Sequence, residues 1–271
     1  MTTPQDAATR RFPTDGPLDL RVHLDYGSVR VRIKPALAAA TVRCTPSIAS
    51  RDQDLDAAQS VRVGLDGTAL DVRGTASGWR RLVRPGSADV DIELPEGSSV
   101  SVTTSYAEVD VAGPVAECSV RTTGGDIRVE EADRVRLETK YGSVTLGLVT
   151  GGAHLESIHG NLRVQHAAGA VDLTASSGDV ELGLAAGDLT VRNTYGAVRV
   201  DALSSGTCAV TTSYGSVDIG IPTGTAAYLD VQSDNGRVRS ELDPTNAPGP
   251  HDDRAAVTAR SHYGSITIRR A

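Results

Sequence analysis

The chain has 271 residues, of which 27 are basic and 34 acidic, giving a formal net charge of −7. Positive and negative residues are interspersed, so the composition gives no electrostatic reason to bind nucleic acid. One Phe, one Trp and one Met accompany 28 glycines, so a core must consist of small branched side chains, which suit thin regular sheets. No apolar run approaches the length of a membrane span, and we expect no membrane insertion.

The first 16 residues, MTTPQDAATRRFPTDG, are polar and are expected to form a disordered tail. They contain no apolar segment typical of a secretory signal. The three cysteines, Cys44, Cys118 and Cys208, are isolated and odd in number, so they predict neither a disulfide framework nor a CxxC site. Both features lead us to expect a cytoplasmic protein.

Residues 17–99 are expected to form an N-terminal β cap together with the first coils of a repeated structure. The stretch DYGSVRV, which begins at Asp25, alternates with the period of a strand. Further strands are predicted around residues 41–44, 60–63, 69–72 and 88–94, with long and irregular connections. Because a repeat protein needs atypical terminal units to close its core, this irregularity favours a cap.

The stretch SGWRRLVRPGS, between two of these predicted strands, contains Trp79 with Arg80, Arg81 and Arg84. Tryptophan and arginine are enriched at interface hot spots, so these four residues are a candidate site for a protein partner. The alternative is structural: Trp79 covers the open end of the core and the arginines remain in solvent.

A short phrase recurs through residues 100–271, in copies such as KYGSVTL, TYGAVRV and SYGSVDI. The apolar residue that follows each corner marks the repeat: Val109, Ile127, Val144, Leu162, Val180, Val198, Val217, Val238 and Ile266. These residues are 17 to 19 positions apart up to Val217 and further apart beyond it. We therefore predict coils of about 18 residues, with a surface loop at residues 241–256, which are rich in Pro, Asp and Gly.

Each repeat contains two alternating runs that meet at a corner. In RVRLETKYGSVTLGL the apolar positions are odd-numbered before Tyr141 and even-numbered after Gly142, and glycine allows the unusual corner conformation. Both an antiparallel hairpin and a β-solenoid are consistent with this change from odd-numbered to even-numbered apolar positions. Tyrosine is a poor first residue for a tight hairpin turn, which favours the solenoid.

The outward residues beside the apolar positions alternate in charge. They are, in order, Arg163, Glu181, Arg199, Asp218 and Arg239. Opposite charges on neighbouring strands are favourable if coils stack in register. We therefore predict an all-β protein: a single-stranded β-solenoid (β-helix) with about 18 residues and two strands per coil, plus an irregular N-terminal β cap. The last strand ends in ITIRRA, where Arg269 and Arg270 are expected to discourage edge pairing.

Six of the seven tyrosines occupy the same corner position. They are Tyr26, Tyr106, Tyr141, Tyr195, Tyr214 and Tyr263. Stacked coils should place Tyr195 above Tyr214, with His159 and Asn235 further along the stripe. Aromatic faces bind apolar ring surfaces, so Tyr141, Tyr195, Tyr214 and Tyr263 form a candidate aromatic stripe for a ligand such as a sugar. The alternative is a structural ladder that shields the backbone at the corner.

Other chemistry finds little support in the sequence. His154, His159 and His166 lie close together but lack carboxylate partners at metal-binding spacing. Asp126 and Asp179 resemble the corners of calcium-binding β-rolls, yet serine or alanine fills the equivalent place in other repeats. We therefore expect no metal, no cofactor and no catalytic residue. A β-helical enzyme is the least favoured class, because the carboxylates are spread out by the charge alternation.

Serial Ser-Gly-Asp-Val units, preceded by SADVDIELPEGSSVSVTTSYAEVDV and closed by AAVTARSHYGSITIRR, resemble the bacterial β-strand-repeat family called "putative adhesin", domain of unknown function 4097. The resemblance covers residues 17–271, and DLRVHLDYGSVRVRIKP is similar to the N-terminal part of the actinobacterial members. It implies a β-helix-like fold without an established enzymatic activity and without catalytic residues. The adhesin name implies a surface location.

The sequence as a whole favours a non-enzymatic scaffold or protein-interaction module. A rigid repeated structure suits extended recognition of an as yet unidentified protein partner, and open coil ends make self-association possible. The alternative function is that of a carbohydrate- or surface-binding, adhesin-like protein that uses the aromatic stripe.

Overall fold

The computed structural model describes residues 9–74, 86–242 and 253–271, which form twenty strands and one helix. The chain divides into two compact units, Met1–Ala132 and Asp133–Ala271, and each is described by itself. Strand β8 (Ile127–Tyr141) runs through the division. The boundary at residue 99 that we expect from the sequence lies within the first unit and stays a prediction.

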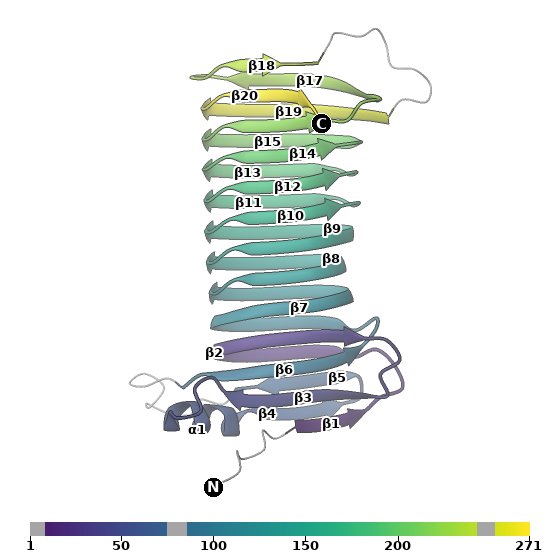
Figure 1. Ribbon diagram of the computed structural model, residues 1–271, viewed down its shortest axis with the longest axis vertical. Helices are drawn as coiled ribbons and strands as arrows, with labels where there is room; N and C mark the ends of the chain where they lie inside the picture. Colours follow the sequence, from purple (N-terminus) through teal and green to yellow (C-terminus); the bar gives the residue numbers. More distant parts are fainter. Residues whose placement is uncertain (1–8, 75–85, 243–252) are drawn as a thin grey trace. The chain divides into compact units, whose positions relative to one another are not determined.

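The second unit is a stack of two-stranded coils (Figure 1). Its strands are β9 (Val144–His159), β10 (Leu162–Ala167), β11 (Val171–Ser177), β12 (Val180–Ala185), β13 (Leu189–Tyr195), β14 (Val198–Leu203), β15 (Gly206–Tyr214), β16 (Val217–Ile221), β17 (Thr225–Ser233), β18 (Val238–Ser240), β19 (Asp253–Tyr263) and β20 (Ile266–Arg270). Strand β10 pairs in parallel with β9 and β12, so that Leu162 lies opposite both Val144 and Val180. Strand β11 pairs in parallel with β9 and β13. Each strand thus pairs with its copies one coil away, which confirms the β-solenoid and excludes the hairpin.

The core of the second unit follows from the alternation in its sequence. Inward positions carry fully buried side chains such as Leu155, Leu173 and Leu182, while their neighbours face solvent. Burying a leucine side chain stabilises a fold by roughly 1.5–3 kcal/mol. Because an aliphatic residue recurs at each inward position, aliphatic side chains stack on one another and the thin core continues from coil to coil.

The last coil of the sequence is not the last coil in space. Strand β19 lies between β15 and β17, and β20 lies between β16 and β18. Arg239 therefore lies opposite Thr267 and not beside Asp218, so the expected charge alternation ends at Asp218. Burial explains this order: Ile266 is fully buried against Val217, whereas Val238 on the outer coil is 45% exposed.

The expectation that Arg269 and Arg270 protect a sheet edge is wrong. Strand β20 is paired along one side with β16, through both arginines, and on its other side with β18. The inserted position of the strand buries Ile268 and directs Arg269 toward Asp218. Residues 253–256, which we expect in the surface loop, belong to β19.

The first unit combines solenoid pairing with an irregular sheet. Its further elements are β1 (Thr9–Pro13), β2 (Asp19–Lys34), β3 (Ala39–Pro46), α1 (Asp52–Ser60), β4 (Arg62–Asp66), β5 (Ala69–Arg73), β6 (Ala88–Pro95) and β7 (Ser99–Gly124). Strand β2 pairs in parallel with β5, β6 and β7, whereas β3 pairs antiparallel with β1 and β6, and β4 antiparallel with β5. This mixture is the irregular N-terminal β cap. Strand β1 falls within the 16 residues that we expect to be a tail.

Helix α1 is an element that the strand pattern does not predict. The carboxylate of its buried Asp54 accepts hydrogen bonds from the backbone N–H groups of Ile48 (3.2 Å) and Ser87 (3.0 Å). One side chain thus ties the helix to two segments that are far apart in the sequence. Within the described residues, no helix has the length and apolar character needed to cross a membrane.

Candidate functional site: an aromatic column

Three tyrosines of the second unit stack at the corner where β13, β15 and β19 end. The rings of Tyr195 and Tyr214 lie 5.0 Å apart and are inclined by 7°. Those of Tyr214 and Tyr263 lie 5.2 Å apart and are inclined by 1°. The parallel register places the three residues opposite one another, so the backbone pairing fixes the ring spacing. The stacking predicted for Tyr195 and Tyr214 is confirmed.

The same column continues toward β9. The rings of Tyr141 and His159 are stacked at 5.3 Å, and Ser177 lies opposite both His159 and Tyr195. We call Tyr141, His159, Tyr195, Tyr214 and Tyr263 the aromatic column; Ser177 interrupts it. At the outer coil, Asn235 donates its backbone N–H to the carbonyl of His262 and continues the line of corner residues.

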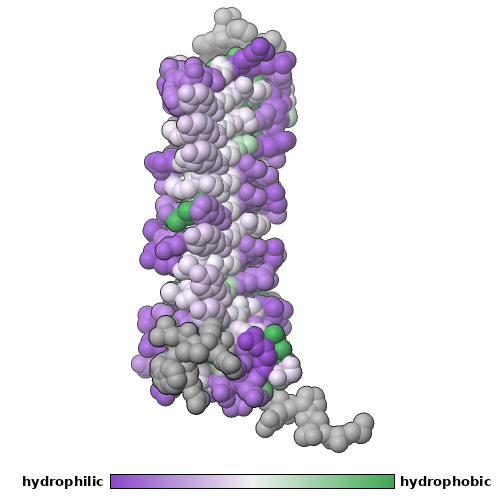
Figure 2. Space-filling view, turned by 90° about the vertical axis from the view of Figure 1, so that its left-hand side faces the viewer, coloured by the Kyte–Doolittle hydropathy of each residue, from purple (hydrophilic) through white to green (hydrophobic). Residues whose placement is uncertain are grey.

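The rings of the aromatic column are half exposed. The tyrosines among them are 46% to 56% accessible to solvent. In Figure 1 the strands β11, β13 and β15 end at the left, and Figure 2 faces that side. It shows a line of pale side chains bordered by hydrophilic ones. The column therefore offers a repeated aromatic surface within a polar exterior.

The first unit contains a shorter version of this arrangement. Tyr26 and Tyr106 are stacked at 5.8 Å, with their rings inclined by 11°. Gly124 follows, and a Cβ atom on it would lie 2.6 Å from the Tyr106 ring. Glycine is thus required there because the ring occupies the space of a side chain.

A second line of residues, on the inner side of the corner, holds the corner backbone. The inner polar column comprises Ser157, Asn193, Thr212, Ser261 and Ser233, with Ala175 in one coil, in strand register. Ser157 donates a hydrogen bond to the carbonyl of Gly142 (3.1 Å), and Asn193 donates to those of Gly178 (3.1 Å) and Gly196 (3.0 Å). These bonds satisfy carbonyl groups that the sharp corner turns away from the strand ladder.

The hydrogen bonds of the inner polar column are not among the features that we expect from the sequence. A signal is nevertheless present: a small polar residue recurs two positions before the corner ring, as in Thr-Ser-Tyr214, Asn-Thr-Tyr195 and Ser-Ile-His159. Two residues that are two positions apart lie on the same side of a strand only where the strand is regular. The corner breaks that regularity, so one side chain is buried and the other is exposed.

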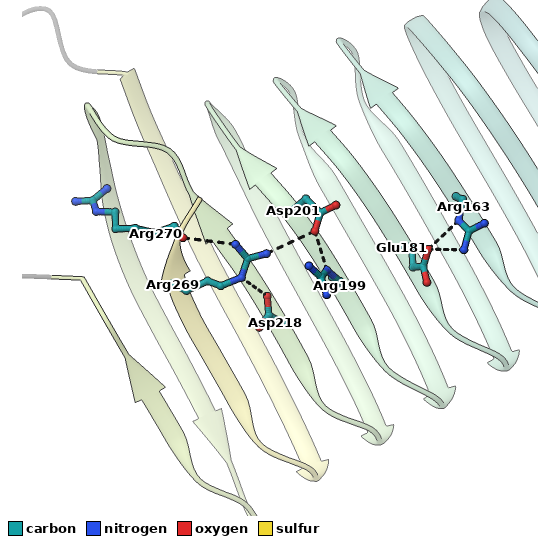
Figure 3. Close-up of polar contacts among 7 residues, drawn as sticks. All are labelled: Arg163, Glu181, Arg199, Asp201, Asp218, Arg269 and Arg270. Atoms are coloured by element: carbon teal, nitrogen blue, oxygen red, sulfur yellow. Dashed lines mark hydrogen bonds and ion pairs between the residues drawn. The ribbon is translucent and has the colours of Figure 1, made fainter.

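The outward charges of β10 to β20 form a charged column, consisting of Arg163, Glu181, Arg199, Asp201, Asp218 and Arg269 (Figure 3). Arg163 binds Glu181 of the next coil, with its Nε atom 2.7 Å from a carboxylate oxygen. Arg199 instead binds Asp201 on its own strand at 2.7 Å, although it lies opposite Glu181. Arg269 spans Asp218 (2.8 Å) and Asp201 (3.5 Å). These exposed pairs favour correct coil register but add little stability.

Other candidate residues differ in where they lie. Trp79, Arg80, Arg81 and Arg84 are outside the described residues, so the hypothesis of a partner site there stays a prediction. In the described ranges 9–74, 86–242 and 253–271, no cluster of three or more His, Cys, Asp or Glu side chains could hold a metal ion. His154 faces Asp172, with its Nδ1 atom 3.4 Å from the carboxylate.

The profile of the family described as Toastrack DUF4097 matches residues 21–271. The chain belongs to this family. No curated protein matches the sequence. Membership of the Toastrack DUF4097 family agrees with the repeated coils described above.

Solved structures similar to this Toastrack protein include a "putative adhesin" from Bacteroides fragilis, with 12% identity, a TM-score of 0.48 and coverage of 96% of both chains. A "putative adhesin" from Parabacteroides distasonis has 11% identity, a TM-score of 0.44 and coverage of 97% of this chain and 96% of that one. A "putative lipid binding protein" from the same species has 8% identity, a TM-score of 0.33 and the same coverage. With identities this low, the function has to be argued from the residues of this chain.

Proposed function

We propose that this protein is a non-enzymatic β-solenoid scaffold that binds a partner through the aromatic column. The observation that carries the proposal is the combination of fixed register and exposure. Backbone pairing holds Tyr195, Tyr214 and Tyr263 about one coil apart, at ring distances of 5.0 and 5.2 Å, while roughly half of each side chain remains accessible.

Rigid aromatic side chains suit binding for an energetic reason. Ordering a flexible side chain on association costs about 0.5–1.5 kcal/mol, and a ring that is already stacked avoids most of that cost. Tyrosine also offers a large apolar face with a hydroxyl group at its edge. A line of such rings presents the same chemistry at each coil, which favours an extended partner over a small compact one.

The charged column supports a binding role without catalysis. The carboxylates of Glu181, Asp201 and Asp218 are each bound by an arginine at 2.6 to 2.8 Å. Each of these oxygen atoms is thus committed to a charge-assisted contact with a guanidinium group. These groups are therefore better suited to fixing the coils than to transferring protons.

Co-purification from the native cell tests the proposal. The triple variant Tyr195→Ser, Tyr214→Ser and Tyr263→Ser removes three rings of the aromatic column. Tyr228→Ser is the matched control, because Tyr228 is 72% exposed but lies outside the column. We expect a partner that is recovered with the wild type and with Tyr228→Ser, and lost with the triple variant. Equal recovery with all three proteins would refute the role of the column.

An adhesin-like protein that binds carbohydrate is the second candidate function. It is favoured by the hydroxyl groups that border the rings, since Ser176 is exposed and Thr194 is partly exposed. Location separates the two candidates. We propose a cytoplasmic location, supported by the free thiols of Cys44, Cys118 and Cys208, because such thiols persist in reducing compartments. Fractionation of cells followed by immunoblotting would decide between cytoplasm and envelope.

Two finer proposals complete this picture. The segment with Trp79, Arg80, Arg81 and Arg84 is proposed as a second contact for a protein partner; its composition supports this role. We also propose that the chain belongs to the actinobacterial branch of the family, on the basis of the similarity of DLRVHLDYGSVRVRIKP to members of that branch.

A further inference from the structure

One coil in the aromatic column lacks a ring. Ser177, at the end of β11, lies directly opposite His159 on β9 and opposite Tyr195 on β13. The coils on either side therefore present ring faces toward a position that holds only a short hydroxymethyl side chain. Ser177 itself is partly exposed, and both flanking rings are exposed, so the position opens to solvent.

The interruption is one ring position wide. Rings on successive coils of this unit are 5.0 to 5.3 Å apart. His159 and Tyr195 are two coils apart, a separation of about 10 Å from the usual strand spacing. A ligand ring placed above Ser177 would thus lie about 5 Å from each neighbouring ring face. That distance suits a saturated sugar ring, whose axial hydrogens make it thicker than an aromatic ring.

The rim of this position carries hydrogen-bonding groups. The exposed residue Ser176 directly precedes Ser177, and the exposed residue Asp179 directly follows the corner glycine Gly178. Asp179 uses its Oδ1 atom to accept the backbone N–H of Ala197 at 2.8 Å, which leaves Oδ2 for a ligand. Asn161 uses its amide oxygen for the backbone N–H of Asp179 at 2.9 Å, which leaves its amide NH₂ group as a donor.

The combination distinguishes a sugar from an aromatic side chain of a protein. A pyranose has apolar faces that stack on aromatic rings and equatorial hydroxyl groups that seek donors and acceptors around the rim. An aromatic amino-acid ring would stack on the faces of the two flanking rings but would leave the hydroxyl, carboxylate and amide groups of the rim without a hydrogen-bond partner on the ligand. The exposed side chain of Ile158, which is 36% accessible, adds an apolar contact beside His159.

We propose that the Ser177 position is a pyranose-binding site, in which one sugar ring stacks between His159 and Tyr195 and its hydroxyl groups bind Ser176, Asn161 and Asp179. This inference rests on the proposed function in its second, carbohydrate-binding form, because it names the substrate class of the same aromatic column. It also gives the interruption a role: the serine leaves room for the ligand that completes the stack.

The test uses the full chain and four simple probes: the methyl pyranosides of glucose, galactose, mannose and N-acetylglucosamine. Binding is followed by ¹H–¹⁵N NMR, with the amides of Gly160 and Gly178 as reporters next to the site. We expect at least one probe to shift these signals. Ser177→Tyr, which fills the position with the residue found in other coils, should weaken that binding at least tenfold.

Three further variants make the result interpretable. Ser177→Ala keeps the space open and should change the affinity less than threefold. Tyr195→Ala removes one wall and should weaken binding at least tenfold, even if Ser177→Tyr fails to fold. Tyr228→Ala removes an exposed ring that lies outside the aromatic column and should leave binding unchanged.

The inference is overturned if no probe shifts the reporter signals, or if Ser177→Tyr and Tyr195→Ala bind as well as the wild type. Its failure can be told from failure of the proposed function by the co-purification experiment. If the partner is lost from the triple tyrosine variant while the sugars do not bind, the column is an interaction surface of another kind. If the partner survives the triple variant, the column itself is not the binding surface.

Discussion

Asn193 shows how a single side chain stabilises a corner of the solenoid. Its amide group is buried and donates to two backbone carbonyls, one in its own coil and one in the coil before it. Thr212 occupies the equivalent place in the next coil, but its buried hydroxyl has no hydrogen-bond partner in the described structure. The two residues therefore share a position and differ in what they contribute.

We expect Asn193→Ala to lower the free energy of unfolding by about 1–3 kcal/mol, since two partly buried carbonyls lose their donors. Thr212→Val should change it by less than about 0.5 kcal/mol or raise it, because it removes an unsatisfied hydroxyl while keeping the shape. Urea denaturation followed by circular dichroism measures both. Equal losses in the two variants would show that the inner polar column acts by packing alone.

Two buried thiols predict a loss of stability at high pH. Burial raises the pKa of Cys118 and of Cys208 from the ordinary value of 9.0 to about 12. The unfolded chain therefore loses these protons at lower pH than the folded chain. The thiols' contribution to stability is complete below pH 9 and declines as the pH rises toward 12.

We expect the wild type to lose stability more steeply between pH 9 and pH 11 than the variant Cys118→Ala, Cys208→Ala, whatever the absolute stability of the variant. Urea titrations at several pH values give the two slopes, and the other groups that titrate in this range are common to both proteins. Parallel slopes would mean that the two thiols ionise equally easily in the folded and unfolded states.

At the scale of the element, the corner between two strands depends on glycine. Gly178 has a φ angle of 144°, and a Cβ atom on it would lie 2.2 Å from the carbonyl oxygen of Gly160 in the coil before. The close approach lets each corner stack directly on the preceding one. Gly152, within β9, has no such constraint, since its nearest non-neighbouring atom would be 3.8 Å from a Cβ.

We expect Gly178→Ala to lower the free energy of unfolding by more than about 3 kcal/mol, because both the backbone conformation and the stacking are disturbed. Gly152→Ala should change it by less than about 1 kcal/mol. Thermal and urea unfolding of the two variants provide the comparison. A small effect of Gly178→Ala would indicate that corners can move apart without loss of strand pairing.

At the scale of the whole molecule, the order of the coils is decided by its C-terminal segment. Strand β19 covers β15, and Cys208 on β15 lies opposite Val257 on β19. The outer strands β17 and β18 pair with β19 and β20. The inserted coil thus closes the core above β15 and β16 and also holds the outer coil in place.

A chain that ends at residue 242 lacks β19 and β20, so β15 loses the strand that covers it. We expect Cys208 to become reactive toward Ellman's reagent, while Cys118 stays protected in the first unit. Mass spectrometry of the labelled protein identifies the modified thiol. Continued protection of Cys208 would mean that β17 can take the place of β19 beside β15.

The local, repeated features of this protein can be predicted from its sequence. A spacing of about 18 residues, glycine corners, alternating apolar positions and tyrosines in one position predict parallel stacked coils and the aromatic column, because each of these signals lies within one or two coils. Helix α1 was not predicted because its nine residues, Asp52–Ser60, lack a strong apolar face. Its position depends on the hydrogen bond between Asp54 and the backbone of Ser87, which is distant in the sequence. The irregular cap was expected, but its antiparallel pairings were not.

Which coils are neighbours depends on the packing of the whole folded chain. The repeat assigns Ile266 and Val238 equivalent places, and nothing in their local pattern tells which one contacts Val217. Burial of Ile266 and Ile268 between two coils favours the inserted order. The corner is a second example. The sequence places Ser177 in line with the tyrosines, but only the pairing of the strands shows that Ser177 lies between the rings of His159 and Tyr195. Contacts between distant segments depend on the free energy of the complete packing, which no single repeat contains.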